Sequence, residues 1–93
     1  MKPTAIVVNT ARGGLIDTIA LTEALNTETI ASAGLDVFET EPLLKDHPLR
    51  TCDRVILTPH SAWYSESSAP KLQRLAAEEI VRALKGEVLR CPV

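Results

Sequence analysis

Three short runs of mainly apolar, small and β-branched residues constrain what this chain can fold into. The runs span residues 5–9, 30–37 and 55–58, and each is bounded by polar residues, glycine or proline. Such runs are typical of strands in a parallel sheet, and the first is predicted to be buried on both faces. A buried helical turn would look similar there, but the Gly-Gly pair that follows favours a strand and a loop. Because helix-like patterns follow the first and third runs, the chain is predicted to be α/β, with right-handed crossovers.

The first helix signal lies between the first two runs. Asp17 is placed to cap a helix, and Ile16 and Leu21 are spaced as a hydrophobic staple around that start. The same helix is predicted to end at Asn26. Gly34, inside the second run, marks a predicted close approach of backbone or ligand.

The last predicted helix has the clearest periodicity in the chain. Its start is predicted at Ser65 or Ser68, and the later start is favoured because Pro70 is tolerated only in a first turn. Gly86 is placed to end this helix. Apolar residues recur at helical spacing at Leu72, Leu75, Ala76, Ile80, Ala83 and Leu84.

Length and composition exclude several classes of protein. A chain of 93 residues forms one domain at most, and none of its apolar stretches is long enough to cross a bilayer. The net charge of −2, without a block of like charges, predicts no direct binding of nucleic acid. The short apolar run near the start falls short of a secretory signal, so we expect a cytoplasmic protein.

Neither the cysteines nor the histidines predict a disulfide or a metal site. Cys52 and Cys91 lack a Cys-x-x-Cys spacing and are expected to be two unrelated thiols. His47 precedes a proline and is predicted to be a turn residue. The set His47, Cys52 and His60 fits no standard zinc spacing, so no metal is expected.

A cation, an acid and an imidazole each follow one of the three apolar runs. They are Arg12, Glu41 and His60, in the phrases Asn-Thr-Ala-Arg-Gly-Gly, Asp-Val-Phe-Glu-Thr-Glu-Pro and Thr-Pro-His. Ligands of open α/β sheets bind outside the carboxyl ends of the strands. The three phrases are therefore predicted to converge on one edge of the sheet.

These side chains suit the handling of a small carboxylic acid. The planar fork of Arg12 matches a carboxylate bidentately, and the two glycines after it would let the backbone approach a ligand. His60 suits proton donation to a carbonyl oxygen and recovery of that proton in reverse. Glu41 is placed to hold the other ring nitrogen and fix the tautomer, although Glu39 or Asp36 would satisfy the chemistry alone equally well.

The three phrases resemble the cofactor-binding domain of the D-isomer-specific 2-hydroxyacid dehydrogenases over essentially the whole chain. Arg12 precedes Glu41 by 29 positions and Glu41 precedes His60 by 19, in the order and spacing of that family. The resemblance implies the C-terminal portion of a Rossmann-like, doubly wound parallel sheet. It also implies NAD(P)-dependent interconversion of a 2-oxo acid and a D-2-hydroxy acid, with Arg12 binding the substrate, His60 as the acid–base group and Glu41 as its partner.

The resemblance further implies a cofactor site, with NAD as the expected cofactor and NADP left open. Asp36 is expected near the nicotinamide carboxamide, with a simple capping or turn role as the alternative. Trp63 lies in a stretch that resembles the C-terminal-binding-protein branch and is also a candidate substrate contact, with core or interface packing as the alternative. The residues expected to line the nicotinamide end are Thr10, Ala11, Arg12, Asp36, His60, Ser61, Ala62 and Trp63.

Other parts of that family do not occur in the 93 residues. The Gly-x-Gly-x-x-Gly turn, the acidic residue that reads the ribose and the separate substrate domain would lie before Met1. The chain is therefore expected to be a single partial dinucleotide-binding domain, residues 1–93, and inactive or nearly so by itself. The parent enzyme is expected to act on a small 2-oxo or 2-hydroxy acid as a homodimer. A non-catalytic, corepressor-like or regulatory NAD-binding module is one alternative, and a truncated product that folds poorly is another.

Overall fold

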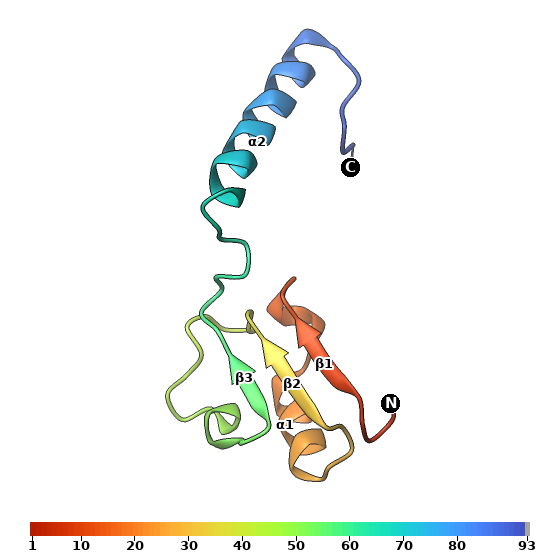
Figure 1. Ribbon diagram of the computed structural model, residues 1–93, viewed down its shortest axis with the longest axis vertical. Helices are drawn as coiled ribbons and strands as arrows, with labels where there is room; N and C mark the ends of the chain where they lie inside the picture. The colour runs from red at the N-terminus through yellow and green to blue at the C-terminus, as the bar shows by residue number, and fades with distance from the viewer. Residues whose placement is uncertain (93) are drawn as a thin grey trace. The chain divides into compact units, whose positions relative to one another are not determined.

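The computed structural model describes residues 1–92, which divide into two compact units with the boundary between Ala62 and Trp63. The first unit holds a sheet, one α-helix and two 3-10 turns, and the second holds one long α-helix (Figure 1). In chain order the elements are β1 (Ile6–Asn9), η1 (Gly13–Leu15), α1 (Thr18–Asn26), β2 (Ser32–Leu35), η2 (Pro48–Thr51), β3 (Val55–Leu57) and α2 (Ser68–Lys85).

The sheet of the first unit has the order β1-β2-β3, and both pairs of neighbours are parallel. Val7 pairs with Ala33, and Ala33 pairs with Val55, so these three residues form one row across the sheet. The α/β class and the parallel pairing predicted from the three apolar runs are confirmed. All three strands are shorter than the runs, because the runs extend into residues that have no ladder partner.

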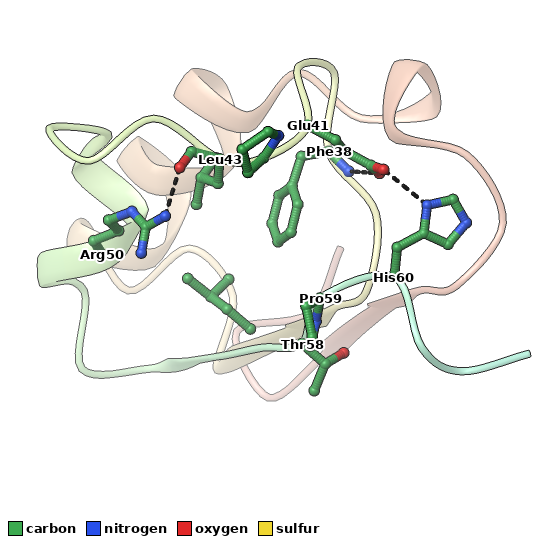
Figure 2. Close-up of a pocket in the computed structure, with 9 residues that line it drawn as sticks. Phe38, Glu41, Leu43, Arg50, Thr58, Pro59 and His60 are labelled. Carbon is green, nitrogen blue, oxygen red and sulfur yellow. Dashed lines mark hydrogen bonds and ion pairs between the residues drawn. The ribbon is translucent and has the colours of Figure 1, made fainter. Parts of the chain in front are cut away.

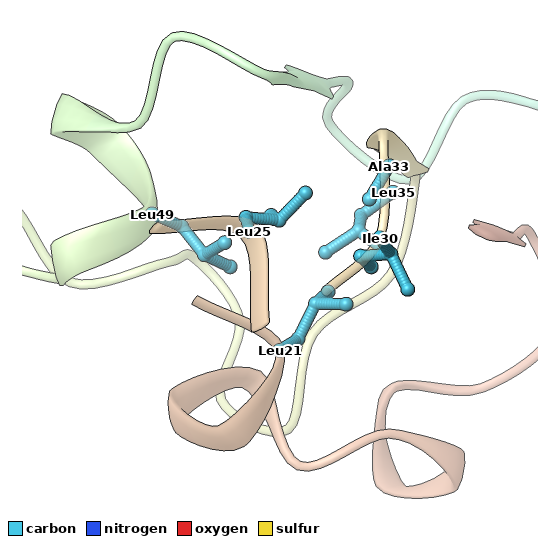
Figure 3. Close-up of a cluster of buried hydrophobic side chains, with 6 residues drawn as sticks. All are labelled: Leu21, Leu25, Ile30, Ala33, Leu35 and Leu49. Atoms are coloured by element: carbon cyan, nitrogen blue, oxygen red, sulfur yellow. The ribbon is translucent and has the colours of Figure 1, made fainter. Parts of the chain in front are cut away.

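The core of the first unit lies on one face of the sheet. Leu25 of α1 and Leu49 of η2 are 1% and 0% exposed, and they pack with apolar side chains of β2. Full burial of a leucine side chain stabilises a fold by about 1.5–3 kcal/mol. These two leucines therefore hold α1, which connects β1 to β2, and η2, which connects β2 to β3, against the sheet. The cluster, drawn in Figure 3, consists of Leu21, Leu25, Ile30, Ala33, Leu35 and Leu49.

The other face of the sheet is not covered by any described element of the first unit. Ile6, Val8 and Ile56 on this sheet are 67%, 69% and 72% exposed. Because α1 and η2 pack against only one side, burial of the first strand on its second face stays a prediction. At Gly34 no described backbone comes close, since a Cβ atom there would make only an ordinary contact, 3.9 Å from Val8 Cγ2; the approach of a ligand at this position stays a prediction.

Helix α1 begins and ends where the sequence predicts. The Asp17 carboxylate accepts hydrogen bonds from the amides of Ile19 and Ala20, both at 3.0 Å. Ile16 packs against the core cluster that contains Leu21, as a hydrophobic staple would require. Because the cap fixes the first turn, the preceding loop enters the helix in a defined direction.

Helix α2 makes up most of the second unit. It begins at Ser68, so Pro70 lies in the first turn as predicted, and it ends at Gly86, whose φ is 70°. The N-cap residue is Ser67, which makes no capping bond through its side chain; the hydroxyl of Ser65 accepts from the Ser68 amide instead, at 2.9 Å. Within the described unit no residue of α2 is buried, and no described helix is long and apolar enough to cross a membrane.

Candidate active site

Three loops follow the carboxyl ends of the three parallel strands. The strands end at Asn9, Leu35 and Leu57, and parallel pairing places these ends at the same edge of the sheet (Figure 1). The loops carry Arg12, Glu41 and His60, respectively, so the predicted convergence of the three phrases on one edge is seen. Such an edge is where open α/β sheets bind ligands.

Glu41 and His60 are in direct contact at this edge. The Oε2 atom of Glu41 lies 2.8 Å from Nδ1 of His60, and Oε1 accepts a hydrogen bond from the Phe38 amide at 3.0 Å (Figure 2). The bond to His60, followed by the bond from the Phe38 amide, lowers the pKa of Glu41 below its ordinary value. Glu41 is therefore ionised at neutral pH, and its contact with Nδ1 fixes the orientation of the His60 ring.

Asp36 shapes the turn that presents His60. Its carboxylate is 3% exposed and accepts from the amides of Ser61 and Ala62, at 3.0 and 2.9 Å, and from the Thr58 hydroxyl. These bonds, that of Thr58 first, lower the pKa of Asp36.

The backbone of His60 is strained within that turn. Its φ is 54°, in the left-handed region, which costs a residue with a side chain about 1–2 kcal/mol. The bonds from Asp36 to the next two amides compensate for this cost. The structural role for Asp36 that the sequence left as an alternative is thus present, and its contact with a cofactor stays a prediction.

Arg12 lies in a loop that is closed by Asn9. Asn9 is 6% exposed; its Nδ2 donates to the Arg12 carbonyl oxygen at 2.9 Å, and its Oδ1 accepts from the Ala11 amide at 3.1 Å. The Arg12 guanidinium is exposed and donates to the Ala11 carbonyl oxygen at 2.8 Å, within its own loop. Thr10 and Ala11 are exposed at the same edge. The role of Asn9 was missed from the sequence, although an asparagine that ends a strand before a turn is a recognised signal for such a loop.

Gly13, the first glycine after Arg12, has a role that the sequence does not indicate. A Cβ atom on Gly13 would overlap the backbone of Phe38 and Glu39, whereas one on Gly14 would meet no described atom within 4 Å. Gly13 therefore permits the approach of another chain segment. As a result, the Arg12 loop is packed against the loop that carries Glu41. The approach of a ligand to these glycines stays a prediction.

A cavity of about 380 Å³ borders the Glu41–His60 pair within the first unit. At its other end Arg50 donates to the carbonyl oxygen of Leu43 (Figure 2). It also donates to the carbonyl oxygen of Leu44, and the two bonds fix the guanidinium. The walls between the pair and Arg50 are mainly apolar. They come from Phe38, Pro42, Leu43, Leu57, Thr58 and Pro59.

Trp63 lies beyond the boundary of the first unit. Its ring is 55% exposed and packs edge-on against Tyr64, with the ring centroids 5.6 Å apart and an interplanar angle of 84°. Ser61 and Ala62, in contrast, belong to the turn held by Asp36. A role of Trp63 toward a substrate or cofactor stays a prediction.

Comparison with known proteins defines the class of protein to which this fold and edge belong. The family model "D-isomer specific 2-hydroxyacid dehydrogenase, NAD binding domain" matches residues 1–62. A glyoxylate reductase of Thermofilum pendens is 48% identical over 88 residues, which are 95% of this chain and 26% of the relative. The chain belongs to the D-isomer-specific 2-hydroxyacid dehydrogenase family.

Solved structures of related enzymes contain the same fold. An acyclic imino acid reductase in complex with NADPH and D-Arg has a TM-score of 0.82 and 38% identity, covering 100% of this chain and 29% of that chain. D-lactate dehydrogenase of Lactobacillus jensenii with NAD+ has a TM-score of 0.75 and 33% identity, covering 100% of this chain and 32% of that chain. The present chain thus spans about a quarter to a third of the length of these three relatives.

Proposed function

We propose that this chain supplies the proton-transfer and carboxylate-binding groups of an NAD(P)-dependent enzyme that interconverts a 2-oxo acid and a D-2-hydroxy acid. The observation that carries this proposal is the Glu41–His60 pair, joined at 2.8 Å at the carboxyl edge of the sheet. Membership of the dehydrogenase family over residues 1–62, which contain both side chains, supports the same assignment.

In the proposed reaction His60 donates a proton from Nε2 to the carbonyl oxygen of the 2-oxo acid and takes it back in the reverse direction. Glu41 holds Nδ1, so it orients the ring and stabilises the imidazolium before the proton leaves. Acid–base assistance of this kind is worth about 10²–10⁴ in rate. Arg12 binds the substrate carboxylate through its guanidinium fork.

NAD(P)H, when bound, supplies the hydride for the second carbon of the substrate. The exposed Thr10–Arg12 loop and the 60–62 turn lie at the edge where the nicotinamide end is expected, so the residues present fit that part of the cofactor. We assign Thr10, Ala11, Arg12, Asp36 and the segment from His60 to Trp63 to this role. The 93 residues contain no Gly-x-Gly-x-x-Gly turn for the pyrophosphate.

We place the chain within a single dinucleotide-binding domain of a homodimeric, cytoplasmic enzyme. Cys52 and Cys91 are free thiols in the described part of the chain, which suits a reducing compartment. Light scattering of the protein that carries this chain would test the dimer, and cell fractionation would test the location.

The test of the proposed function is a steady-state assay of NADH or NADPH oxidation with a panel of 2-oxo acids. The assay compares the parent protein with its His60→Gln variant. The substitution is expected to lower kcat/KM by a factor of about 10²–10⁴. Glu66→Gln, at an exposed acid outside the site, is the matched control and is expected to leave kcat/KM unchanged. Equal activity of His60→Gln and the parent protein would exclude the proposed role, and turnover by the isolated 93 residues would exclude the expectation that they are inactive alone.

A further inference from the structure

A buried threonine joins three segments of the first unit that are remote in sequence. Thr18, the first residue of α1, is 2% exposed. Its hydroxyl donates to Oε2 of Glu39 at 2.7 Å and lies 3.1 Å from Nε2 of His47. Its amide also donates to Oε1 of Glu39, at 3.4 Å. The start of α1, the loop after β2 and the start of η2 therefore meet at one hydroxyl.

The donors and acceptors of this network can be arranged in only one direction. The Leu49 amide donates to Nδ1 of His47 at 3.1 Å, so Nδ1 is an acceptor and the ring hydrogen lies on Nε2. Nε2 then donates to the hydroxyl of Thr18, whose own hydrogen goes to the carboxylate of Glu39. Each hydrogen bond in such a chain strengthens the next, because the groups polarise one another.

The network holds the loop that presents Glu41 to His60. Glu39 lies between Phe38, whose amide binds one oxygen of Glu41, and Glu41 itself. Gly13 packs against the backbone of Phe38 and Glu39, so the Arg12 loop rests on the same two residues. Glu39 is exposed, and its two hydrogen bonds to Thr18 hold its side chain against the start of α1.

We propose that Thr18, Glu39 and His47 are positioning residues, which fix the 38–41 loop so that Glu41 meets Nδ1 of His60 in the geometry observed. None of the three contacts the reacting atoms in this assignment; they act through Glu41. The consequence for catalysis rests on the proposed function, but the coupling between Thr18 and the Glu41–His60 contact does not.

The test is the pKa of Glu41, measured by carboxyl carbon NMR on the full 93-residue chain. Thr18→Val keeps the shape of the side chain and removes the hydroxyl, so the loop loosens, the bonds to Glu41 weaken and its pKa rises toward the ordinary value. Thr18→Ser restores the hydroxyl and is expected to restore the low pKa. Thr22→Val is the matched control, because Thr22 is also buried in α1 and its hydroxyl donates only to the Thr18 carbonyl oxygen.

Glu39→Ala tests the same coupling from an exposed residue, where unfolding is not expected. Removing a nearby negative charge would by itself lower the pKa of Glu41, so a rise can come only from loss of the loop geometry. A pKa of Glu41 that stays low in Thr18→Val and in Glu39→Ala would overturn the proposal. So would an equal rise in Thr22→Val.

The catalytic consequence is measured separately in the protein that carries this chain. Thr18→Val is expected to lower kcat by up to about 10²-fold with little change in KM, as for a small misplacement of a reacting group. If that protein turns over no 2-oxo acid, the proposed function fails while the NMR result still decides the positioning role. If the NMR result is negative while turnover persists, only the positioning role fails.

Discussion

The interactions that stabilise the first unit internally differ in kind from those within the second unit. In residues 1–62, side chains from α1, η2 and the sheet are buried together, and the hydrogen bonds of Asp36 and Thr18 join segments more than 20 positions apart. In the second unit the described hydrogen bonds and ion pairs join residues at most 12 positions apart. Gly86 ends α2, and Glu78 binds Arg74 at 2.6 Å and Arg90 at 2.9 Å.

This difference shows that regular secondary structure and tertiary stabilisation need not occur in the same segment. Helix α2 has strong local signals and forms over 18 residues, yet none of its described side chains is buried. The loops of the first unit have no regular structure of their own, yet tertiary contacts fix them. The candidate catalytic pair is found in the loops and not in the long helix, because a reacting group needs fixed neighbours more than it needs regular backbone.

Truncation of matched leucines should give the largest contrast between the units. Leu25→Ala removes a side chain that is 1% exposed and is expected to cost about 2–5 kcal/mol of unfolding free energy. Leu84→Ala, in α2 at a position 83% exposed, should change it by about 0.5 kcal/mol or less. Urea titration followed by the amide NMR signals of each unit measures both, and equal losses would contradict the contrast.

Substitution of two glycines compares a position limited by contact with another segment, Gly13, with one limited by its own backbone conformation, Gly86. Gly13→Ala forces a methyl group onto the backbone of Phe38 and Glu39, so we expect a loss of about 1–3 kcal/mol in the first unit and a disturbed Glu41–His60 contact. Gly86→Ala has open space but a φ of 70°, so about 1–2 kcal/mol should be lost, confined to the end of α2. Gly14→Ala is the control and should be nearly neutral. NMR shift changes confined to residues 12–14 in Gly13→Ala would argue against this explanation.

The helix starts should respond differently to loss of a polar side chain. Asp17→Ala removes the bonds to two amides and is expected to cost about 0.5–2 kcal/mol. Ser67→Ala should have almost no effect, because Ser67 makes no capping bond. Ser65→Ala, which removes the acceptor of the Ser68 amide, is the positive control in the second unit. Helix content by circular dichroism and the urea midpoint would show the ranking.

The smallest expected contrast is between one carboxyl group of each unit, Asp36 and Glu78, in how their pKa values respond to salt. The pKa values of Asp36 and Glu78 are both lowered, by the Thr58 hydroxyl and backbone amides for Asp36 and by Arg74 and then Arg90 for Glu78. A carboxyl group with a lowered pKa stabilises the fold above its unfolded pKa, so this stability should be lost as the pH falls below about 4. Added salt screens arginine charges but not short bonds from neutral donors.

Carboxyl NMR titrations at low and high salt would measure this contrast. The pKa of Glu78 should rise toward its ordinary value in high salt, while that of Asp36 should change little. Asp36→Asn should flatten the acid dependence of stability in the first unit. An equal response of both carboxyl groups to salt would contradict the assigned causes.

Local features of this fold were predictable from the sequence, and tertiary ones were not. The cap at Asp17 and the end at Gly86 depend on residues within one turn, and both were predicted correctly. The roles of Gly13 and Thr18 depend on partners 21 to 29 positions away, so no local pattern indicates them. The apolar run of β1 shows that burial of both faces is favourable, but it does not show which element would cover the second face.

The candidate site divides in the same way. Arg12, Glu41 and His60 were found because their residue types follow strand ends, and the structure brings Glu41 and His60 into contact. The closing of the Arg12 loop by Asn9 and the left-handed backbone of His60 need the three-dimensional structure. Asp36 was singled out with a capping or turn role as the alternative to a cofactor contact, but its bonds to the 61–62 amides need the three-dimensional structure.

The bonds from Asp36 to Ser61 and Ala62 have a consequence for the rigidity of the candidate pair. Asp36 follows β2, whereas Ser61 and Ala62 follow β3, so one buried residue at the end of a strand fixes the backbone after the neighbouring strand. The orientation of His60 toward Glu41 is thus inherited from strand pairing, and a substitution that shifts the register of β2 against β3 is expected to disturb the pair as well.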